Sequence, residues 1–351
     1  MTAPKTTASE RLRPRWRSAL IVTTAATVAA LAGFSGWFRY TLSPVQHDRA
    51  NGGVAFFEVR PGDNLTGVAR ALEARGLIRS ALAMRGLARA QSLETKLKVG
   101  EYELSPDLST PEIAHILASG RVRTHAIVIP EGTRAVEIAD RLALEGLADR
   151  EEFLRIVLDP KTVRKFKVEG PTLEGYLFPD TYRFAKGLSA EKIAEAMVGE
   201  FREVYRALRS TSPKSELSMR ELVTLASIVE KETGVPEERP LIAAVFLNRM
   251  QRGMRLETDP TVIYGIADFD GNLRRVHLED ADNPYNTYQI PGLPPGPIAS
   301  PGREAMRAVL EPAESPFLFF VSRNDGTHIF SKSYRDHARA VVHFQKQRRQ
   351  R

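Results

Sequence analysis

The sequence predicts an α+β protein with a single membrane-spanning helix near its N-terminus, and three observations support this fold class. An uncharged run at residues 18–38 is long enough to cross a bilayer core of about 30 Å as a helix. Short alternating segments occur between amphipathic helical segments, which indicates small sheets among helices. The chain has 351 residues, which is longer than a chain that folds around a single compact core usually is, so at least two domains are expected.

Composition and charge narrow the classes of function. Hydrophobic residues make up 42% of the chain and charged residues 26%, as in ordinary globular proteins. The net charge is +7, but four arginines precede residue 18 and three lie in 348–351, so much of the excess is in the tails. We therefore expect no nucleic-acid partner, which would need a basic stripe on a folded module. With no cysteine, no H-E-x-x-H and no G-x-S-x-G, we also expect no metal and no cofactor.

The uncharged run favours a membrane anchor over a cleaved signal peptide. Ala30-Leu31-Ala32 resembles a cleavage site, but the apolar run continues to Trp37 and Phe38, which suit a membrane interface. Arginines crowd its N-terminal side, so the positive-inside rule places the N-terminus in the cytoplasm. This gives a cytoplasmic tail at 1–17, a transmembrane helix at 18–38, a linker at 39–54, and an extracytoplasmic remainder anchored in the cytoplasmic (inner) membrane.

A first small α+β region is predicted at residues 55–165. A short strand, a Pro-Gly-Asp turn and an amphipathic helix recur at a constant offset of 70, which relates Gly62 to Gly132 and Gly76 to Gly146. Between the copies lie a strand and a helix capped by Ser109 or Thr110. The strand-turn-helix pattern is similar to LysM-type glycan-binding modules. The same residues also describe any small α+β unit with a tight turn, so glycan binding by this region stays open.

A second α+β region is predicted at residues 166–351. "EGYLFPDTYRF" indicates a loop and a short strand, and Ser189 caps a long amphipathic helix. Near the C-terminus, "NDG" at 324–326 predicts a hairpin turn, and a final helix is expected from about Tyr334.

The stretch "ASIVEKETG" carries the first candidate for chemistry. Ser218 and Glu221 form a capping box, so a helix should begin near Met219 and stop at Gly234 in a left-handed conformation. Its two glutamates, at 230 and 232, flank opposite edges of an apolar stripe, so periodicity cannot choose between them. The second lies in the last turn, where the helix dipole disfavours a carboxylate and should raise its pKa, as a general acid requires. The alternative is that both are solvated helix residues.

Further candidates lie downstream of this helix. In the next helix, Asn248 is either a packing amide or a substrate contact. Asp259 is expected as an N-cap, with Pro260 at the first helical position. The segment "NPYNTYQIPGLPPGPIASPG" is stiff and rich in amides and hydroxyls, which suits holding a sugar chain.

Several long motifs resemble one family. "LASIVEKET", "VFLNRM", "GMRLETDPTVIYG", "YNTY" and "GLPPGPIASPG", in this order after "EGYLFPDTYRF", are similar to the endolytic murein transglycosylase family (MltG-type, YceG-like). The resemblance implies a membrane-anchored enzyme that cuts peptidoglycan strands internally, terminates glycan elongation and meets wall synthases such as penicillin-binding proteins. It places the essential glutamate at Glu232. The substrate-binding candidates are Asn248, Thr258, Asp259, Tyr285, Asn286 and Thr287.

The resemblance also implies a reaction that one carboxyl can serve. The 6-hydroxyl of N-acetylmuramic acid attacks C1 of its own ring, and a single glutamate protonates the leaving oxygen and then accepts the hydroxyl proton. One departure is Glu257, where an amide is expected, although its simplest role is at the N-terminal end of the next helix. Two alternatives stay open: a water-using muramidase with Glu257 as second carboxylate, and a non-catalytic wall-binding scaffold.

The arginine asymmetry generates a topology prediction. A reporter enzyme that works only outside the cytoplasm should be active when fused to the C-terminus, and a cytoplasmic reporter should not be. Activity of reporter fusions in intact cells measures this. A mature N-terminus mapped near Gly33 would instead identify residues 18–38 as a cleaved signal.

Overall fold

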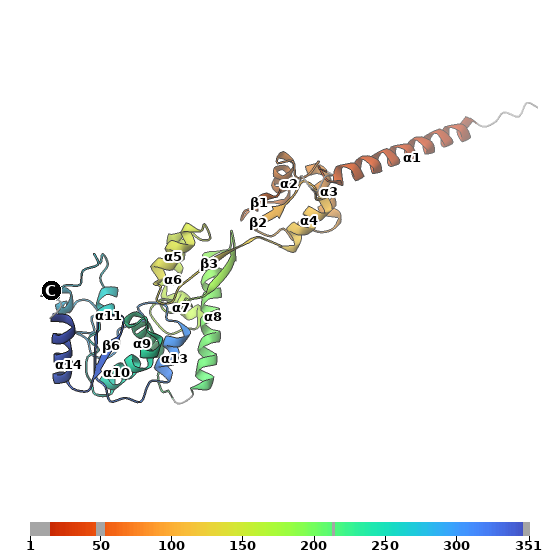
Figure 1. Ribbon diagram of the computed structural model, residues 1–351. Coiled ribbons are helices and arrows are strands. Elements are labelled where there is room, and N and C mark those ends of the chain that lie inside the picture. Colours follow the sequence, from red (N-terminus) through yellow and green to blue (C-terminus); the bar gives the residue numbers. More distant parts are fainter. Residues whose placement is uncertain (1–14, 47–52, 213–214, 347–351) are drawn as a thin grey trace, which may run out of the picture. The chain divides into compact units, whose positions relative to one another are not determined.

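The computed structural model describes residues 15–46, 53–212 and 215–346 (Figure 1). Its fold class is mixed α+β, mostly helical, with three two-stranded sheets in the described part. The chain divides into two compact units between residues 123 and 124, and each unit is described by itself. The arginines at 11, 13 and 348–351, most of the predicted tail and part of the linker lie outside the described residues.

The N-terminal apolar helix is present and longer than predicted. Helix α1 covers Arg15–Leu42, and its stretch Leu20–Leu42 has a mean hydropathy of 1.5 with none of its apolar window buried. It is apolar enough to cross a membrane or to be a signal sequence. Arg79 donates to the hydroxyl of Tyr40, near the end of this helix, at 3.1 Å, and to the carbonyl oxygen of Pro44, just beyond the helix, at 2.7 Å.

The first unit contains one small sheet and three short helices. Strand β1 (Ala55–Val59) pairs antiparallel with β2 (Gly100–Leu104), with Phe57 opposite Tyr102. Helices α2 (Leu65–Ala74), α3 (Ala81–Ala90) and α4 (Thr110–Ser119) cover it. The predicted start of α4 is confirmed, because Ser109 caps it in a capping box. The largest buried side chains of this core are Phe57, Leu72, Met84, Tyr102, Leu104, Ile113 and Leu117.

The strand-turn-helix repeat is confirmed, but the two copies belong to different units. The paired glycines share left-handed backbones, with φ of 90° at Gly62 and 73° at Gly132, and 67° at Gly76 and 63° at Gly146. The second copy consists of β3 (Thr124–Val128) and α5 (Ala135–Leu144).

Strand β3 pairs with β4 (Thr181–Ala185), which follows residue 165 in the chain. The structural division at 123/124 therefore differs from the predicted region 55–165, because residues 124–165 pack into the second core.

The second unit is built around helix α9 (Met219–Glu232), which packs against α13 (Arg303–Leu310) and α10 (Arg239–Gln251) (Figure 1). Every residue of 222–229 is buried. The remaining elements are α6 (Arg150–Leu158), α7 (Pro160–Phe166), α8 (Ala190–Thr211), the 3-10 turn η1 (Pro236–Glu238), α11 (Asp259–Tyr264), α12 (Arg275–Glu279), β5 (Phe319–Ser322), β6 (His328–Ser331), α14 (Tyr334–Val341) and η2 (Val342–Lys346).

Most predicted helix and turn signals of this unit are confirmed. Ser189 caps α8, Ser218 and Glu221 form the capping box of α9, and the hairpin joins β5 to β6 around residues 324–326. Asn324 and Gly326 have φ of 64° and 92°, the left-handed values such a turn needs. The final helix begins at Tyr334 as predicted.

Two predicted helix ends are wrong. Gly234 is not left-handed; instead Thr233 closes α9 in an extended conformation, with φ −143° and ψ 138°. This conformation lets the hydroxyl of Thr233 accept a hydrogen bond from the backbone N–H of Val235 at 3.0 Å. The N-cap of α11 is Thr258, and Asp259 is its first helical residue.

The position of the unit boundary can be tested with fragments. A fragment that begins at residue 124 should unfold cooperatively in urea, whereas one that begins at residue 166 should not. The shorter fragment loses several large buried side chains at about 1.5–3 kcal/mol each, a total comparable with the whole stability of a domain. These are Ile127, Ile138, Leu142, Phe153 and Val157. Circular dichroism during the titration measures this; equal midpoints and slopes for the two fragments would contradict it.

Candidate active site

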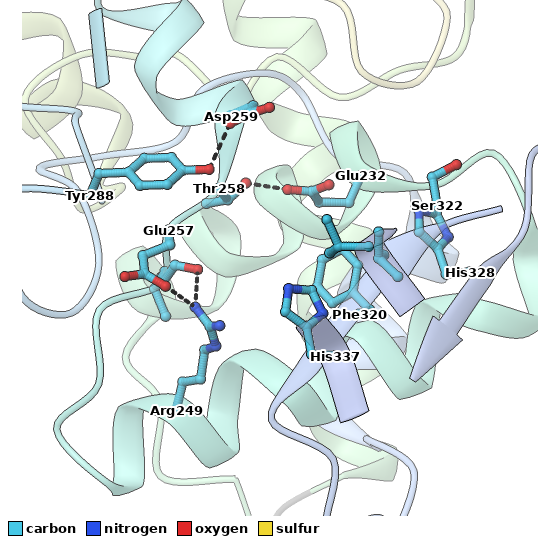
Figure 2. Close-up of a pocket in the computed structure, with 13 residues that line it drawn as sticks. Glu232, Arg249, Glu257, Thr258, Asp259, Tyr288, Phe320, Ser322, His328 and His337 are labelled. Carbon is cyan, nitrogen blue, oxygen red and sulfur yellow. Dashed lines mark hydrogen bonds and ion pairs between the residues drawn. The ribbon is translucent and has the colours of Figure 1, made fainter. Parts of the chain in front are cut away.

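The second unit contains a cleft of about 570 Å³ into which Glu232 projects from the end of α9 (Figure 2). One wall comes from the segment around the start of α11 and from the loop that carries Tyr288. The opposite wall comes from β5, β6 and α14. The lining residues are Glu232, Arg249, Leu256, Glu257, Thr258, Asp259 and Tyr288, and, from the C-terminal wall, Phe320, Val321, Ser322, His328, His337 and Val341.

Glu232 has the environment of a general acid. The hydroxyl of Thr258 donates a hydrogen bond to its Oε1, and the side chain stays partly exposed to the cleft. Burial raises the pKa of Glu232 to about 7; the Thr258 hydroxyl opposes this rise and the charge of Asp259 adds to it. A substantial fraction of this carboxyl is therefore protonated near neutral pH, and the same group remains within reach of a ligand.

Glu230 has a different environment, which separates the two glutamates that periodicity left equivalent. Its Oε1 accepts a hydrogen bond from Arg239 at 3.1 Å, and its Oε2 accepts one from the backbone N–H of Gly302, the N-cap of α13, at 2.9 Å. Only 6% of the Glu230 side chain is exposed. Glu230 therefore joins α9, α10 and α13 as a buried ion pair, and it does not line the cleft.

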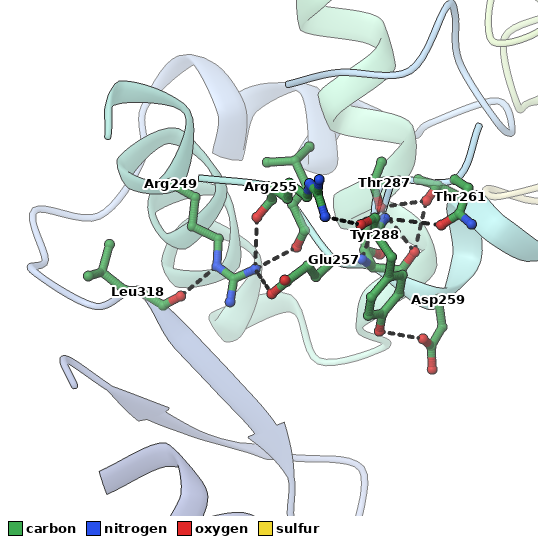
Figure 3. Close-up of polar contacts among 11 residues, drawn as sticks. Arg249, Arg255, Glu257, Asp259, Thr261, Thr287, Tyr288 and Leu318 are labelled. Atoms are coloured by element: carbon green, nitrogen blue, oxygen red, sulfur yellow. Dashed lines mark hydrogen bonds and ion pairs between the residues drawn. The ribbon is translucent and has the colours of Figure 1, made fainter. Parts of the chain in front are cut away.

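Glu257 lines the cleft but is held by an arginine. Its backbone is left-handed, with φ of 51°, and its Oε2 accepts a hydrogen bond from Arg249 at 3.1 Å. Arg249 also donates to the carbonyl oxygens of Leu318 at 2.7 Å and Leu256 at 2.8 Å (Figure 3). The sequence-based expectation that Glu257 serves the N-terminal end of α11 is corrected, because its observed partner is Arg249.

Thr258 and Asp259 reach the cleft, together with a tyrosine that the sequence analysis missed. The Thr258 hydroxyl does not cap α11, because it is directed to Glu232. Asp259 accepts a hydrogen bond from the hydroxyl of Tyr288 at 2.7 Å (Figure 3). Burial raises the pKa of Tyr288, and the neighbouring charge of Asp259 adds to this rise. Tyr288 therefore remains a neutral hydrogen-bonding group at physiological pH.

The other sequence candidates lie behind the cleft walls. Asn248 donates to the carbonyl oxygens of Ser315 at 2.8 Å and Phe317 at 3.0 Å, so it is a packing amide that holds the segment before β5. None of its atoms lines the cleft, so the structure favours the packing alternative over the substrate contact.

The predicted sugar contacts of the "YNTY" motif lie behind the cleft wall that contains the start of α11. Asn286 is fully buried and donates to the carbonyl oxygens of His277, Leu278 and Asp280 at 2.7–3.1 Å. The hydroxyl of Thr287 accepts a hydrogen bond from the backbone N–H of Thr258 at 3.1 Å. The Tyr285 ring packs on Tyr264 with centroids 4.7 Å apart. Thr287 therefore holds Thr258 and Tyr285 packs on α11, whereas Asn286 holds the segment 277–280.

The C-terminal wall is the largest part of the cleft that the sequence analysis missed. Ser322 and His328 flank the predicted hairpin turn, which was the available signal for this region. No sequence pattern relates this hairpin to Glu232. Among the described residues, no three His, Asp or Glu side chains are grouped so that they could hold a metal ion.

Comparisons with known proteins agree on one family. A family model described as the YceG-like family matches residues 57–343. The chain is 30% identical over 315 residues to a Bacillus subtilis (strain 168) protein named endolytic murein transglycosylase, covering 85% of this chain and 86% of that protein. It is 30% identical over 312 residues to a protein of the same name from Streptococcus pneumoniae (strain D39), covering 80% of this chain and 56% of that protein.

A solved structure is similar as well. The crystal structure of a YceG-like protein from Listeria monocytogenes matches with a TM-score of 0.57 and 32% identity, covering 83% of this chain and all of that chain.

The raised pKa of Glu232 predicts how stability depends on pH. Between pH 4.5 and about 7 the folded state keeps a proton that the unfolded state releases, so this group lowers stability as pH rises. Glu232→Gln removes that loss, and the variant should become more stable than the wild type by up to about 3 kcal/mol above pH 8. Below pH 4 the two should agree. Urea unfolding at a series of pH values measures the difference.

Glu230→Gln is the matched control for this measurement. Breaking its buried ion pair should lower stability by about 3–5 kcal/mol near neutral pH. Parallel stability curves for the wild type and Glu232→Gln would contradict the assigned environment of Glu232.

Proposed function

Because this chain belongs to the YceG-like family, we propose that it is an endolytic murein transglycosylase that cuts peptidoglycan strands between N-acetylmuramic acid and N-acetylglucosamine. The observation that carries this proposal is Glu232, a carboxyl of raised pKa that lines the cleft. A protonatable carboxyl in an open cleft also favours an enzyme over a wall-binding scaffold.

Glu232 serves as the general acid in this reaction. Its protonated carboxyl donates to the glycosidic oxygen, which leaves as a neutral hydroxyl when the bond to C1 breaks. The hydroxyl of Thr258 then stabilises the carboxylate that forms. The carboxylate is one candidate for accepting the proton of the attacking group.

The attacking group is the 6-hydroxyl of the same N-acetylmuramic acid. Because the attack is intramolecular, proximity supplies much of what a second catalytic carboxylate otherwise contributes, and the product is a 1,6-anhydro ring. The environments of the other two cleft carboxyls support this assignment. Glu257 is paired with Arg249, and Asp259 accepts a hydrogen bond from Tyr288, so neither is a free base for water.

Membership of the family and the apolar helix α1 also support a location at a membrane. We assign α1 as a single-pass anchor in the cytoplasmic membrane, with the chain that follows it on the extracytoplasmic side, where nascent glycan strands are made. There the enzyme would terminate strand elongation beside wall synthases. The unit that contains α2, α3 and α4 is assigned as the LysM-like region.

Analysis of the products distinguishes the proposed reaction from that of a water-using muramidase. We predict that digestion of peptidoglycan in oxygen-18 water yields strands ending in 1,6-anhydro-N-acetylmuramic acid with no label incorporated, because the 6-hydroxyl competes successfully for C1. Mass spectrometry of the products measures this. Glu232→Gln, which is isosteric but cannot donate a proton, should lower the rate by at least about 100-fold. Labelled reducing ends would overturn the proposal and make Glu257 the second catalytic carboxylate.

A further inference from the structure

The end of helix α1 is held close to the start of helix α3. Arg79 is the residue before Ser80, the N-cap of α3. Its guanidinium donates to the hydroxyl of Tyr40 at 3.1 Å, and the central guanidinium carbon lies 4.7 Å from the centroid of the Tyr40 ring. The same guanidinium donates to the carbonyl oxygens of Pro44 at 2.7 Å and Val45 at 3.1 Å. Helix α1 also packs against α3, so the two helices form one junction.

The length of α1 sets the level of this junction in a bilayer. The apolar stretch begins at Leu20, and twenty residues of helix rise about 30 Å, which is the thickness of a hydrocarbon core. A span that enters the core at Leu20 therefore leaves it near Tyr40. Trp37 and Tyr40 are 46% and 61% exposed, and both are residue types typical of a membrane interface. Because the headgroups add about 5–8 Å on each side, the start of α3 lies at headgroup level when α1 spans the membrane.

Helix α3 has one exposed face that carries no acidic residue. It consists of Leu82, Arg85, Gly86 and Arg89, which occupy positions i, i+3, i+4 and i+7 and so share one side of the helix. We call these four residues the α3 face. All of them are exposed, and Leu82 is 67% exposed. Neither arginine has a hydrogen bond or an ion pair with any residue in the described ranges of the chain.

The chemistry of the α3 face fits a layer of anionic phospholipid headgroups. Guanidinium groups bind phosphate oxygens through paired hydrogen bonds, and an exposed leucine beside them can insert among the lipids. Arg85 and Arg89 lie about 5 and 10 Å along the helix from Leu82, comparable with the Debye length of about 8–10 Å, so both can respond to the charge of the surface. Helix α4, which also contacts α1, has the acidic Glu112 in its first turn, so it does not extend the basic face.

We propose that the α3 face docks onto the anionic phospholipid headgroups of the membrane that α1 crosses. This inference rests on the assignment of α1 as an anchor in the proposed function, and it goes beyond the reaction assigned to the cleft. A leucine and two arginines alone give weak, reversible membrane binding. Because the anchor keeps α3 at the surface, docking is intramolecular and takes place at a high effective concentration of lipid. The first unit is thereby attached to the bilayer at two points.

The experiment places a fluorescent reporter on the α3 face of the full chain, reconstituted in vesicles. Because the sequence has no cysteine, one introduced cysteine can be labelled selectively with an environment-sensitive fluorophore. Gly86→Cys leaves the leucine and both arginines of the face unchanged, and a Cβ at Gly86 meets nothing within 4 Å. Gly67→Cys is the matched control, because Gly67 is an exposed glycine in helix α2 of the same unit.

Quenching by a lipid with a spin-labelled headgroup reports docking. In vesicles of equal parts phosphatidylglycerol and phosphatidylcholine, we expect the fluorophore at 86 to be quenched several-fold more than the one at 67. In phosphatidylcholine alone, or in high salt, this difference should disappear. Combining Arg85→Gln and Arg89→Gln should lower the ratio of docked to undocked protein about 30-fold in the mixed vesicles.

A second double variant controls for net charge. Arg70→Gln with Arg121→Gln removes the same charge from two other exposed arginines of the unit, neither of which has a partner among the described residues. We expect it to leave the quenching at 86 unchanged. Both double variants should keep the melting temperature of the wild type, because the four arginines are exposed and unpaired.

Three outcomes would overturn the proposal. Equal quenching at 86 and 67 in the mixed vesicles would show that the α3 face does not dock. Undiminished quenching at 86 in phosphatidylcholine alone would show that anionic headgroups are not the partner. An equal loss of quenching in the two double variants would show that the net charge of the unit, and not the α3 face, attracts it. Failure of the anchor assignment is a different result, because the wild type would then not float with either kind of vesicle.

Discussion

The burial of residues 222–229, the middle of helix α9, is the constraint on which the rest of the second unit depends. Residues 222–229 are at most 1% exposed, and after them the helix leaves the core in its last turn. Two carboxyls emerge there, and a carboxylate at that boundary needs partners. Glu230 receives Arg239 and the N-terminal end of α13, whereas Glu232 receives one hydroxyl, from Thr258. This difference in partners makes the first a structural ion pair and the second a titratable acid.

Two residues of the cleft also depart from the conformational and capping preferences of their residue types. Thr258 occupies an N-cap position but directs its hydroxyl to Glu232, and Glu257 before it has a left-handed backbone although it is not glycine. Such a backbone is unfavourable for a side-chain-bearing residue, and here Arg249 and the buried Thr287 hold the segment in place. Departures of this kind are expected at functional sites, because the surrounding structure maintains a geometry that the local sequence would not adopt.

Local features were predictable because they depend on residues a few positions apart. The capping box of α9, the hairpin turn at 324–326 and the left-handed glycines of the repeat all follow from short-range hydrogen bonding and glycine conformation. The cleft walls were not predictable, because they depend on which distant segments pack together. Asn286 shows the limit most clearly: its composition-based assignment as a hydrogen-bonding amide is right, but its partners are backbone carbonyls, which residue type alone cannot distinguish from a sugar.

The two copies of the strand-turn-helix repeat have different partners in the structure. In the first unit, the corresponding copy packs on its own small sheet. In the second unit, the backbone N–H of Ala135, at the start of α5, donates to the buried carboxyl of Glu174, which also accepts a hydrogen bond from Tyr264 at the end of α11. In the turn of the same copy, the carbonyl of Gly132 accepts a hydrogen bond from Lys231, beside Glu232. The repeat thus braces both α9, which carries Glu232, and α11, which follows Thr258, so the distance between acid and hydroxyl depends on a segment that never enters the cleft.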